Sequence, residues 1–314
     1  MVKHLYGRTA AGDFGPLALK ACRREMIDKG WSRTYTNAQI DRIRRAFRWA
    51  AEEEMLPGSI YQNLKAVAGL RAGKSKARET EKVKPVPQEH IDAALPFASP
   101  PVGALVRLQL LTGCRPAEVC LIRPIDIDMR NPSCWVYRPG SDQGSHGTHK
   151  TAHHGHERMI FIGPKAQEVL RPFLGTKLDA YCFSPAESES RRNTGRRSQR
   201  KTPLWPSHQR RKAKAKRQRS PGDRYDTHSY RRAIARACRK ADAAAHKQDA
   251  SIPEDQVIVP AWSPNRLRHN RATELRPYGL DMAKTVLGHT KVETTQIYAE
   301  KDVQAAMELV ARIG

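Results

Sequence analysis

Arg115 is placed where a phosphate could bind. It follows Leu-Thr-Gly-Cys, in which Gly113 turns the chain, and it precedes Pro116, which suits the first position of a helix. The free N–H groups and the dipole of a helix start favour an anion, and a guanidinium there can hold a phosphate through two hydrogen bonds. Glu118, one turn later, could orient Arg115. Taken alone, the segment fits a surface Arg–Glu ion pair equally well.

Lys150 is a candidate proton donor. It lies in Thr-His-Lys-Thr, before a turn rich in Gly and His, and a lysine at the tip of a hairpin can protonate a leaving group. The same stretch admits a second interpretation, a metal site, although no helix or carboxylate would fix the ligands in geometry. The histidines concerned are His146, His149, His153, His154 and His156.

Two later segments could complete a phosphate site. Residues 263–269 open a predicted helix and contain Asn265 and Arg268. A Leu-Gly-His sequence ends at His289, and Tyr298 follows nine residues later. A helical tyrosine taken alone is usually a packing residue whose hydroxyl reaches the surface. The significance of Tyr298 therefore depends on the segments before it.

Helices and one small sheet would have to position these residues. Hydrophobic periodicity and runs of β-branched or aromatic residues predict a mainly α protein with a small antiparallel β-sheet, an α+β fold. Helices are predicted over 13–29, 36–51, 59–70, 88–95, 102–111, 164–174, 227–245, 264–276, 282–287 and 291–313, and strands over 122–129, 134–137 and 158–162.

The chain divides into two predicted domains. Residues 1–72 form a helical N-terminal domain, and residues 88–314 form a larger second one. Between them, 73–87 is rich in Gly, Lys and Pro with almost nothing apolar, which predicts a basic linker. A two-domain protein with such a linker could wrap around a rod-like ligand.

One helix of the N-terminal domain has two distinct faces. Beginning at Thr36, a candidate N-cap, its apolar residues Ile40, Ile43, Phe47 and Ala51 recur at spacings of three and four. A separate basic stripe on this helix could meet phosphate, as could two lysines of the linker, although a solvated basic face explains the stripe equally well. These candidate DNA contacts are Arg42, Arg45, Arg48, Lys74 and Lys76.

The charge of the chain points to a polyanionic partner. Its 56 Lys and Arg residues against 32 Asp and Glu give a net charge of +24, and nucleic acid is the commonest partner of such a protein. Thirteen of the basic residues lie in the low-complexity segment 184–222, which predicts disorder or a basic arm that orders on nucleic acid. Charge alone separates neither DNA from RNA nor binding from catalysis.

Several classes of protein are not supported by the sequence. No apolar run is long enough for a membrane span, and the first residues do not resemble a secretion signal. The six cysteines lack C-x-x-C spacing, which predicts reduced thiols in a cytoplasmic protein rather than a disulfide framework or a zinc site.

Taken together and in order, the segments resemble the motifs of the tyrosine recombinase, or phage integrase, family. Thr-Gly-Cys-Arg-Pro-Ala-Glu is similar to its first arginine box, and Asn-Arg-Leu-Arg to its His-x-x-Arg box. Leu-Gly-His is similar to its third box. The resemblance covers about residues 88–302, and residues 1–72 resemble the family's core-binding domain more loosely. It implies a catalytic set of Arg115, Lys150, Asn265, Arg268, His289 and Tyr298, with Glu118 in support.

The resemblance also implies a mechanism. Tyr298 would attack a phosphorus of double-stranded DNA and form a 3′-phosphotyrosine, with Lys150 protonating the 5′ oxygen that leaves. The arginines would supply the positive charge, so no metal, ATP or other cofactor is implied. The resemblance further implies a protein that is a monomer when free and acts as a tetramer on two DNA sites. Its DNA substrate would place it at the nucleoid in the cytoplasm.

The tail after Tyr298, residues 301–313, is predicted to be a helix. Val303, Met307 and Val310 recur at helical spacing, so the helix could dock on a neighbouring subunit or fold back on its own domain.

One position departs from the family pattern. The family usually has histidine where this chain has Asn265, and an asparagine can donate a hydrogen bond to phosphate but cannot transfer protons near neutral pH. His269 lies one residue beyond the box and points in another direction on a helix, so we do not expect it to substitute.

Three alternative functions stay open at this stage. A type IB topoisomerase shares the cleavage chemistry but reseals the same strand. A catalytically inactive DNA-binding protein of the same fold would account for Asn265 but not for the retained arginines, lysine and tyrosine. A basic RNA-binding protein would account for the charge but for none of the boxes.

Overall fold

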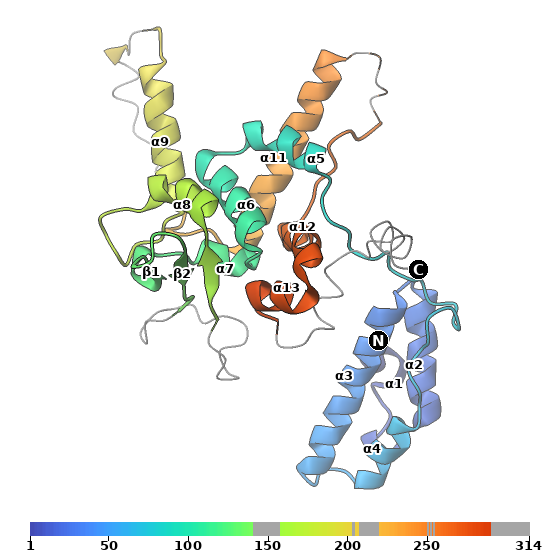
Figure 1. The fold of residues 1–314 in the computed structure, drawn as a ribbon. Coiled ribbons are helices and arrows are strands. Elements are labelled where there is room, and N and C mark those ends of the chain that lie inside the picture. Colours follow the sequence, from blue (N-terminus) through green and yellow to red (C-terminus); the bar gives the residue numbers. More distant parts are fainter. Residues whose placement is uncertain are drawn as a thin grey trace, which may run out of the picture. The chain divides into compact units, whose positions relative to one another are not determined.

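The computed structural model describes residues 1–140, 158–202, 205–206, 220–249, 251, 253 and 255–289. The chain forms two compact units, Met1–Val83 and Lys84–Gly314, drawn in Figure 1 with colours that follow the sequence. Because each unit has its own hydrophobic core, each is described by itself.

The first unit is a small helical domain. Its helices pack around buried side chains such as Leu19, Met26 and Ile40. The predicted apolar face is confirmed, since Ile43 and Phe47 also pack on this core. The helices are α1 (Val2–Tyr6), α2 (Pro16–Asp28), α3 (Arg33–Glu52) and α4 (Gly58–Lys65).

The predicted start of α3 at Thr36 is wrong. The helix is capped one turn earlier by Ser32, whose Oγ accepts a hydrogen bond from the Tyr35 N–H at 3.4 Å. Serine is a better N-cap residue than threonine, and Thr36 is buried inside the first turn instead.

The segment predicted as a linker is anchored at both ends. Arg78 forms a β-bridge with Ser32, and Glu79 forms an ion pair of 2.6 Å with Arg33, so this part belongs to the first unit. In the second unit, Val86 is buried and its backbone N–H and C=O both bond to the side chain of Asn270. The stretch without such anchors is therefore shorter than the predicted 73–87.

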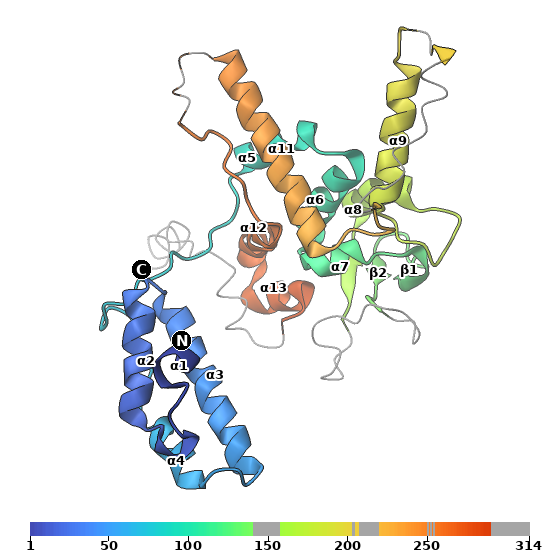
Figure 2. The ribbon, with the colours of Figure 1, turned by 180° about the vertical axis from the view of Figure 1, so that it is seen from behind.

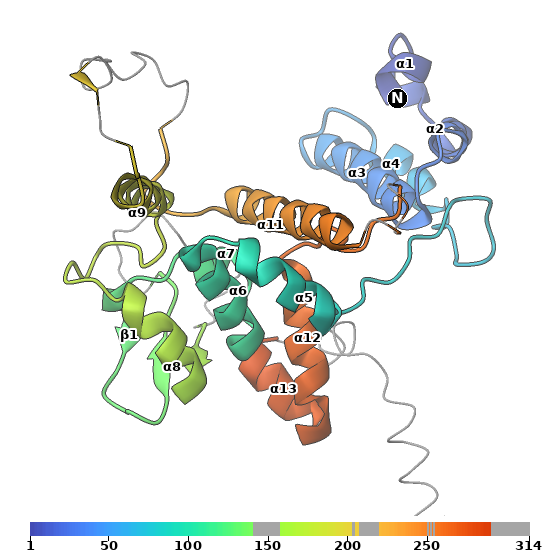
Figure 3. The ribbon, with the colours of Figure 1, turned by 90° about the horizontal axis from the view of Figure 1, so that it is seen from above.

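The second unit is built around helix α6 (Pro100–Thr112). Nine of its 13 residues are buried, because neighbours cover it on several sides. It packs against α8 (Pro164–Leu170) and α12 (Asn265–Leu275), and Figure 3 shows α12 and α13 (Leu280–Leu287) beside it. The core of this unit is centred on α6.

A long helix crosses the back of this unit. α11 (Thr227–Gln248) packs on α5 (Gln88–Ala94) and α7 (Pro116–Cys120), as Figure 2 shows. Asp226 caps α11 by accepting the Ser229 N–H. Its buried Tyr230 donates its hydroxyl to Gln109 on α6 at 3.1 Å, which fixes the two helices against each other.

A three-stranded antiparallel sheet completes the second unit. Its strands are β1 (Ile127–Asp128), β2 (Trp135–Tyr137) and β3 (Ile160–Ile162), in the order β1-β2-β3 with Tyr137 opposite both Ile127 and Ile160. The strands are shorter than predicted, partly because Pro124 begins a 3-10 turn ahead of β1. The predicted fold class, mainly α with a small antiparallel sheet, is confirmed.

Part of the basic insert is helical where we expected disorder or an arm that orders only on nucleic acid. α9 (Pro185–Ser198) has Pro at its first position and a cap from Ser184, whose Oγ accepts the Glu187 N–H. Glu187 in the first turn and Arg196 near the end suit the helix dipole. Local capping thus forms a helix that buries none of its residues.

The described helices and the cysteines bear on the predictions about membranes and disulfides. Among the described residues, no helix is both long and apolar enough to cross a bilayer. All six cysteines are free, and Cys134 is the least buried of them.

Gly113 makes the turn between α6 and α7 possible. Its φ of +67° lies in the left-handed region, and a Cβ there would come within 2.6 Å of Leu287 Cδ2 and 3.0 Å of Arg271 Cγ. The turn therefore needs glycine both for its backbone conformation and for the close approach of α12 and α13.

We predict that Gly113→Ala lowers the free energy of unfolding by about 2 to 4 kcal/mol, from left-handed strain and overpacking together. Urea denaturation of the full chain, followed through the transition of the second unit, measures the effect. Gly103→Ala is the matched control, because its Cβ would meet only Leu95 Cδ2 at 3.9 Å inside α6. That substitution should be neutral or stabilising by up to about 1 kcal/mol. Equal losses in the two variants would contradict the prediction.

Candidate active site

Arg115 and Glu118 form the first part of a buried charge cluster. Arg115 caps α7, and its backbone N–H donates to Glu118 Oε2 at 2.7 Å while its Nη1 donates to Oε1 at 2.7 Å. The carboxylate thus holds both the backbone and the guanidinium of Arg115. This is the orienting contact that the sequence suggested for Glu118.

A second arginine reaches the same carboxylate from the sheet. Arg158, just before β3, lies 3.2 Å from Glu118 Oε1 through Nε and 3.5 Å from Oε2 through Nη2. Its Nη1 donates to the carbonyl of Met159. The two guanidinium groups hold the pKa of Glu118 at about 2 against the opposing effect of burial. Glu118 is therefore an ion between two cations.

Arg268 is the most deeply buried member of the cluster. Its side chain points from α12 into the unit, and only 1% of the residue is exposed. Nη1 donates to the carbonyl of Gly113 at 2.6 Å, and Nη2 donates to the carbonyl of Leu287 at 2.7 Å. Nη2 also lies 2.6 Å from Nε2 of His289. One guanidinium thereby joins the ends of α6 and α13.

The contact with Arg268 fixes the protonation of His289. A guanidinium can only donate, so Nε2 of His289 must accept, and the ring is neutral with its proton on Nδ1. Burial, followed by the positive charges of Arg268, Arg115 and Arg158, lowers the pKa of His289 to about 3. His289 thus stays neutral at physiological pH in the structure.

Gly288 sets the position of His289 at the end of α13. It ends the helix with a φ of +63°, and the backbone N–H of His289 donates to the Lys284 carbonyl at 3.0 Å. A Cβ on Gly288 would collide with the guanidinium of Arg158. Arg158 therefore lies between the Leu-Gly-His sequence and Glu118 of the first arginine box.

The group formed by Arg115, Glu118, Arg158, Arg268 and His289, called here the arginine cluster, suits an anion. Three cations and one carboxylate give it a net charge of +2 while His289 is neutral. Side-chain exposure falls from 25% at Arg115 to 4% at Arg158, so a ligand reaches the cluster through Arg115. Within the residues that the structure describes, no group of three or more His, Cys, Asp or Glu side chains could hold a metal ion.

Asn265 does not join the hydrogen bonds of the cluster. It is the first residue of α12, exposed, and lies one turn before Arg268. His269, in contrast, is buried among the helices. The two side chains therefore differ in their access to solvent.

Several predicted functional residues lie outside the described residues. They are Lys150 and Tyr298, the five histidines of the hairpin segment and the tail helix 301–313. Of the predicted site, the structure therefore brings together Arg115, Glu118, Arg268 and His289.

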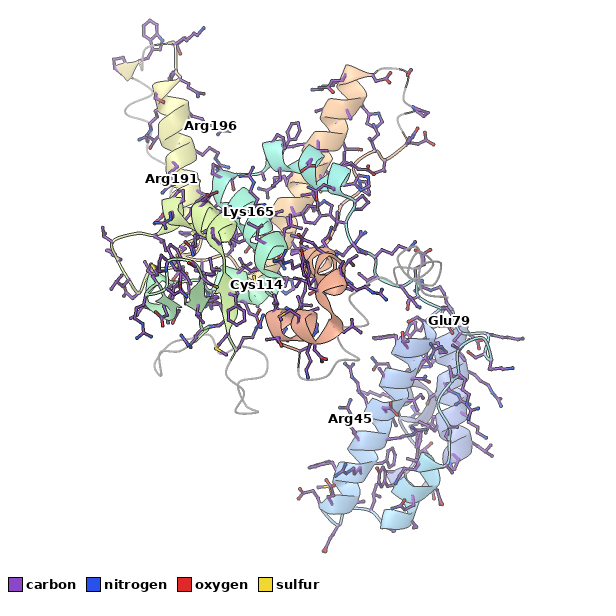
Figure 4. The ribbon with its side chains drawn as sticks, viewed as in Figure 1. Arg45, Glu79, Cys114, Lys165, Arg191 and Arg196 are labelled. Atoms are coloured by element: carbon purple, nitrogen blue, oxygen red, sulfur yellow. The ribbon has the colours of Figure 1, made fainter. Side chains whose placement is uncertain are left out.

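The candidate DNA contacts of the first unit lie on its surface. Arg42, Arg45 and Arg48 are exposed on α3, where Figure 4 labels Arg45, and Arg48 donates from Nε to Glu52 at 2.7 Å. Lys74 and Lys76 are exposed as well. Their positions are compatible with phosphate contacts and equally with a solvated basic surface.

A second basic surface lies at the far end of α6. A groove of about 770 Å³ separates α9 from α11 and is lined by Pro100–Val102, the first residues of α6, whereas the arginine cluster begins after its last residue. Figure 4 shows Arg191 on α9, away from Cys114 at the α6–α7 turn. The groove is thus distinct from the cluster; its cations are Arg191, Arg192, Arg232, Arg236 and Lys240.

Arg158 is the member of the cluster that sequence reasoning missed. It stood in the Glu-Arg-x-Ile sequence after the predicted hairpin, and the signal was present in the alternation of β3. Residues 158, 160 and 162 share one face of the strand and are all buried. A charged residue on the buried face of a strand requires a buried partner, which here is Glu118.

We predict that Glu118→Gln destabilises the protein by about 3 kcal/mol or more at pH 7, because two arginines lose their buried counter-ion. The folded pKa of Glu118, about 2, lies below its ordinary value near 4.5. Its stabilisation is therefore present above pH 4.5 and is lost as the pH falls toward 2. The difference in unfolding free energy between wild type and variant should shrink over that interval.

Urea denaturation at several pH values measures this difference. The matched control is Glu274→Gln, which also breaks an Arg–carboxylate pair three residues apart, 2.8 Å to Arg271, but on the surface. It should cost less than about 1 kcal/mol at every pH. A Glu118→Gln variant as stable as this control would refute the buried ion.

A comparison with known protein families shows which family the sequence matches. The sequence profile of the phage integrase family matches residues 98–305, a range that contains every predicted catalytic residue. Among curated proteins, no sequence matches this chain.

Solved structures share the fold at low sequence identity. The integrase of transposon Tn1549 in complex with transposon right end DNA is 16% identical, with a TM-score of 0.58 over 96% of this chain and 86% of that one. The same integrase with a circular intermediate DNA is 15% identical, with a TM-score of 0.54 over 95% and 86% of the two chains. A lambda integrase dimer bound to a COC′ core site is 14% identical, with a TM-score of 0.54 over 93% and 82%.

The order of the boxes, their meeting in one buried cluster and the profile match over about two thirds of the chain lead to one conclusion: this chain belongs to the phage integrase family of tyrosine recombinases.

Proposed function

We propose that this protein is a site-specific DNA recombinase that cuts and rejoins double-stranded DNA through a 3′-phosphotyrosine on Tyr298. The observation that carries the proposal is the arginine cluster, in which the two arginine boxes and the Leu-Gly-His box meet. A site of net charge +2, open to solvent at Arg115, is suited to a phosphodiester. The DNA complexes of similar integrases support duplex DNA as the substrate.

In this mechanism the cluster stabilises the transition state. Arg115 and Arg268 neutralise the charge that develops on the non-bridging oxygens when phosphorus becomes five-coordinate. A guanidinium keeps its charge at any physiological pH, so these groups are ready before the DNA arrives. This is the charge that a metal ion supplies in other phosphoryl-transfer enzymes, and the proposed reaction uses neither metal nor ATP.

Tyr298 forms the covalent intermediate, and Lys150 supplies the proton for the leaving group. The phenol of Tyr298 loses its proton to solvent as its oxygen forms a bond to phosphorus, the bond to the 5′ oxygen breaks, and Lys150 gives that oxygen a proton. The energy of the phosphodiester is kept in the phosphotyrosine. A 5′-hydroxyl from a partner strand can therefore reverse the step and join two DNA molecules.

Asn265 has a narrower role in this proposal than the usual histidine. At the exposed start of α12, its amide can donate a hydrogen bond to a phosphate oxygen, but it does not exchange protons. Proton transfer therefore rests on Lys150, and Asn265 positions phosphate.

Recombination requires two DNA sites, and we propose that four copies of the chain assemble on them while the free protein is a monomer. The basic residues of α3, together with Lys74 and Lys76, would hold the DNA backbone from the first unit. Such contacts position the protein on DNA without reading its sequence.

We predict that the protein forms a covalent adduct with nicked suicide duplexes and that Tyr298→Phe abolishes it while leaving DNA binding intact. A library of duplexes with randomised cores, resolved on denaturing gels, supplies the substrate. Tyr278→Phe is the control, because Tyr278 is exposed and lies outside the cluster. An adduct that survives Tyr298→Phe would refute the nucleophile, and relaxation of supercoils without joining of two sites would favour a topoisomerase.

We predict that Lys150→Ala slows cleavage of ordinary DNA by roughly 100-fold or more, the usual contribution of a positioned acid. A substrate with sulfur in place of the leaving 5′ oxygen should restore the rate, because a thiolate leaves without a proton. The same substrate should not rescue Tyr298→Phe. Failure of the sulfur substrate to rescue Lys150→Ala would exclude Lys150 as the acid.

A further inference from the structure

Arg158 stands out among the buried charges because it joins parts of the chain that are far apart in sequence. Its partner Glu118 lies 40 residues earlier, in α7. On its other side the guanidinium fills the space that a Cβ of Gly288 would need, at the turn after α13. Arg158 itself lies at the start of β3, so one side chain touches three elements of the cluster.

The contacts of Arg158 act on two residues of the candidate phosphate site, Arg115 and His289. Through Nε and Nη2 it approaches the two oxygens of Glu118, and those oxygens accept the backbone N–H and Nη1 of Arg115. Glu118 is further fixed because its backbone carbonyl accepts the hydroxyl of Tyr137 on β2 at 3.0 Å. The orientation of Arg115 is therefore set by a carboxylate that Arg158 holds in place.

The second residue on which Arg158 acts is His289. The turn at Gly288 carries His289 into contact with Arg268, and the guanidinium of Arg158 packs directly on that turn. The positive charge of Arg158 adds to those of Arg268 and Arg115 in lowering the pKa of His289, while Glu118 acts in the opposite direction. The four charged groups that face His289 therefore include Arg158.

A comparison within the same unit shows what is specific to Arg158. Arg123 is also a buried arginine with a buried carboxylate, 2.8 Å from Asp126. That partner is only three residues away, in the 3-10 turn before β1, so this ion pair is local in sequence. The pair of Arg158 instead connects α7, β3 and the end of α13.

We propose that Arg158 is a positioning residue of the recombinase centre: it fixes Glu118 behind Arg115 and supports the turn that carries His289. In this proposal its guanidinium serves Glu118 and the Met159 carbonyl rather than the DNA. The inference rests on the proposed function for its catalytic meaning. The effect of Arg158 on His289 can be measured without DNA cleavage.

Two substitutions separate charge from geometry. Arg158→Gln removes the positive charge and most of the contacts, whereas Arg158→Lys keeps the charge but cannot span both Glu118 and the Gly288 turn. Arg123→Gln is the matched control, since it also removes a buried arginine from a carboxylate. All three are compared with wild type in the full chain.

The first measurement is the rate of adduct formation at saturating suicide duplex, together with the affinity for the same DNA. We expect Arg158→Gln to slow adduct formation roughly 10- to 100-fold relative to Arg123→Gln, as expected for a displaced reacting group. DNA affinity should change by less than about threefold, because contacts to the rest of the duplex are kept. Arg158→Lys should recover part of the rate. Equal slowing in Arg158→Gln and Arg123→Gln overturns the proposal.

The second measurement is the titration of the His289 ring by NMR, which needs no activity. Loss of a positive charge favours the protonated ring, so the pKa of His289 should rise in Arg158→Gln and stay near the wild-type value in Arg158→Lys and Arg123→Gln. An unchanged titration in Arg158→Gln overturns the proposal. If wild type forms no adduct, the proposed function fails, and this titration alone decides on Arg158. If Arg158→Gln does not fold, a wild-type cleavage rate in Arg158→Lys overturns the proposal.

Discussion

The second unit depends on one buried guanidinium. Arg268 binds the carbonyl of Gly113, the carbonyl of Leu287 and the ring of His289, and so ties together the ends of α6 and α13 from α12 between them. Both carbonyls belong to helix ends, where backbone oxygens lack partners within the helix. The left-handed turns at Gly113 and Gly288 expose these oxygens to Arg268. The same side chain thus satisfies the fold and forms the candidate site.

A buried cation of this kind requires compensation, which Glu118 provides at the neighbouring position. Its carboxylate keeps Arg115 and Arg158 in fixed orientations, yet one carboxylate against three arginines leaves an excess of positive charge. A fully neutralised cluster would have no net attraction for phosphate. On the proposed function, the excess charge serves phosphate binding, and the buried ion pairs hold the arginines in position for it.

Sequence patterns predicted much of this arrangement. Periodicity located most helices, and the chemistry of arginine at a helix start located Arg115, because both depend on local residue spacing. The start of α3 was missed because both Ser32 and Thr36 are residue types that cap helices, and the apolar spacing did not distinguish them. Arg158 was missed because its importance comes from Glu118, 40 residues away. Helix α9 was missed because the basic, low-complexity composition of 184–222 predicts disorder, whereas the helix depends on local capping by Ser184 and Glu187.

The arrangement also explains how a neutral histidine can serve a phosphate site. While Arg268 donates to Nε2, His289 offers only Nδ1–H. On the proposed mechanism, a phosphate at the arginine cluster lies close to the charges that act on His289. The negative charge of the phosphate then opposes the arginines that hold the pKa of His289 near 3, so the ring gains basicity when the substrate is bound. Binding of DNA would thereby raise the pKa of His289 above its value in the free protein, whereas Asn265 carries no group that titrates.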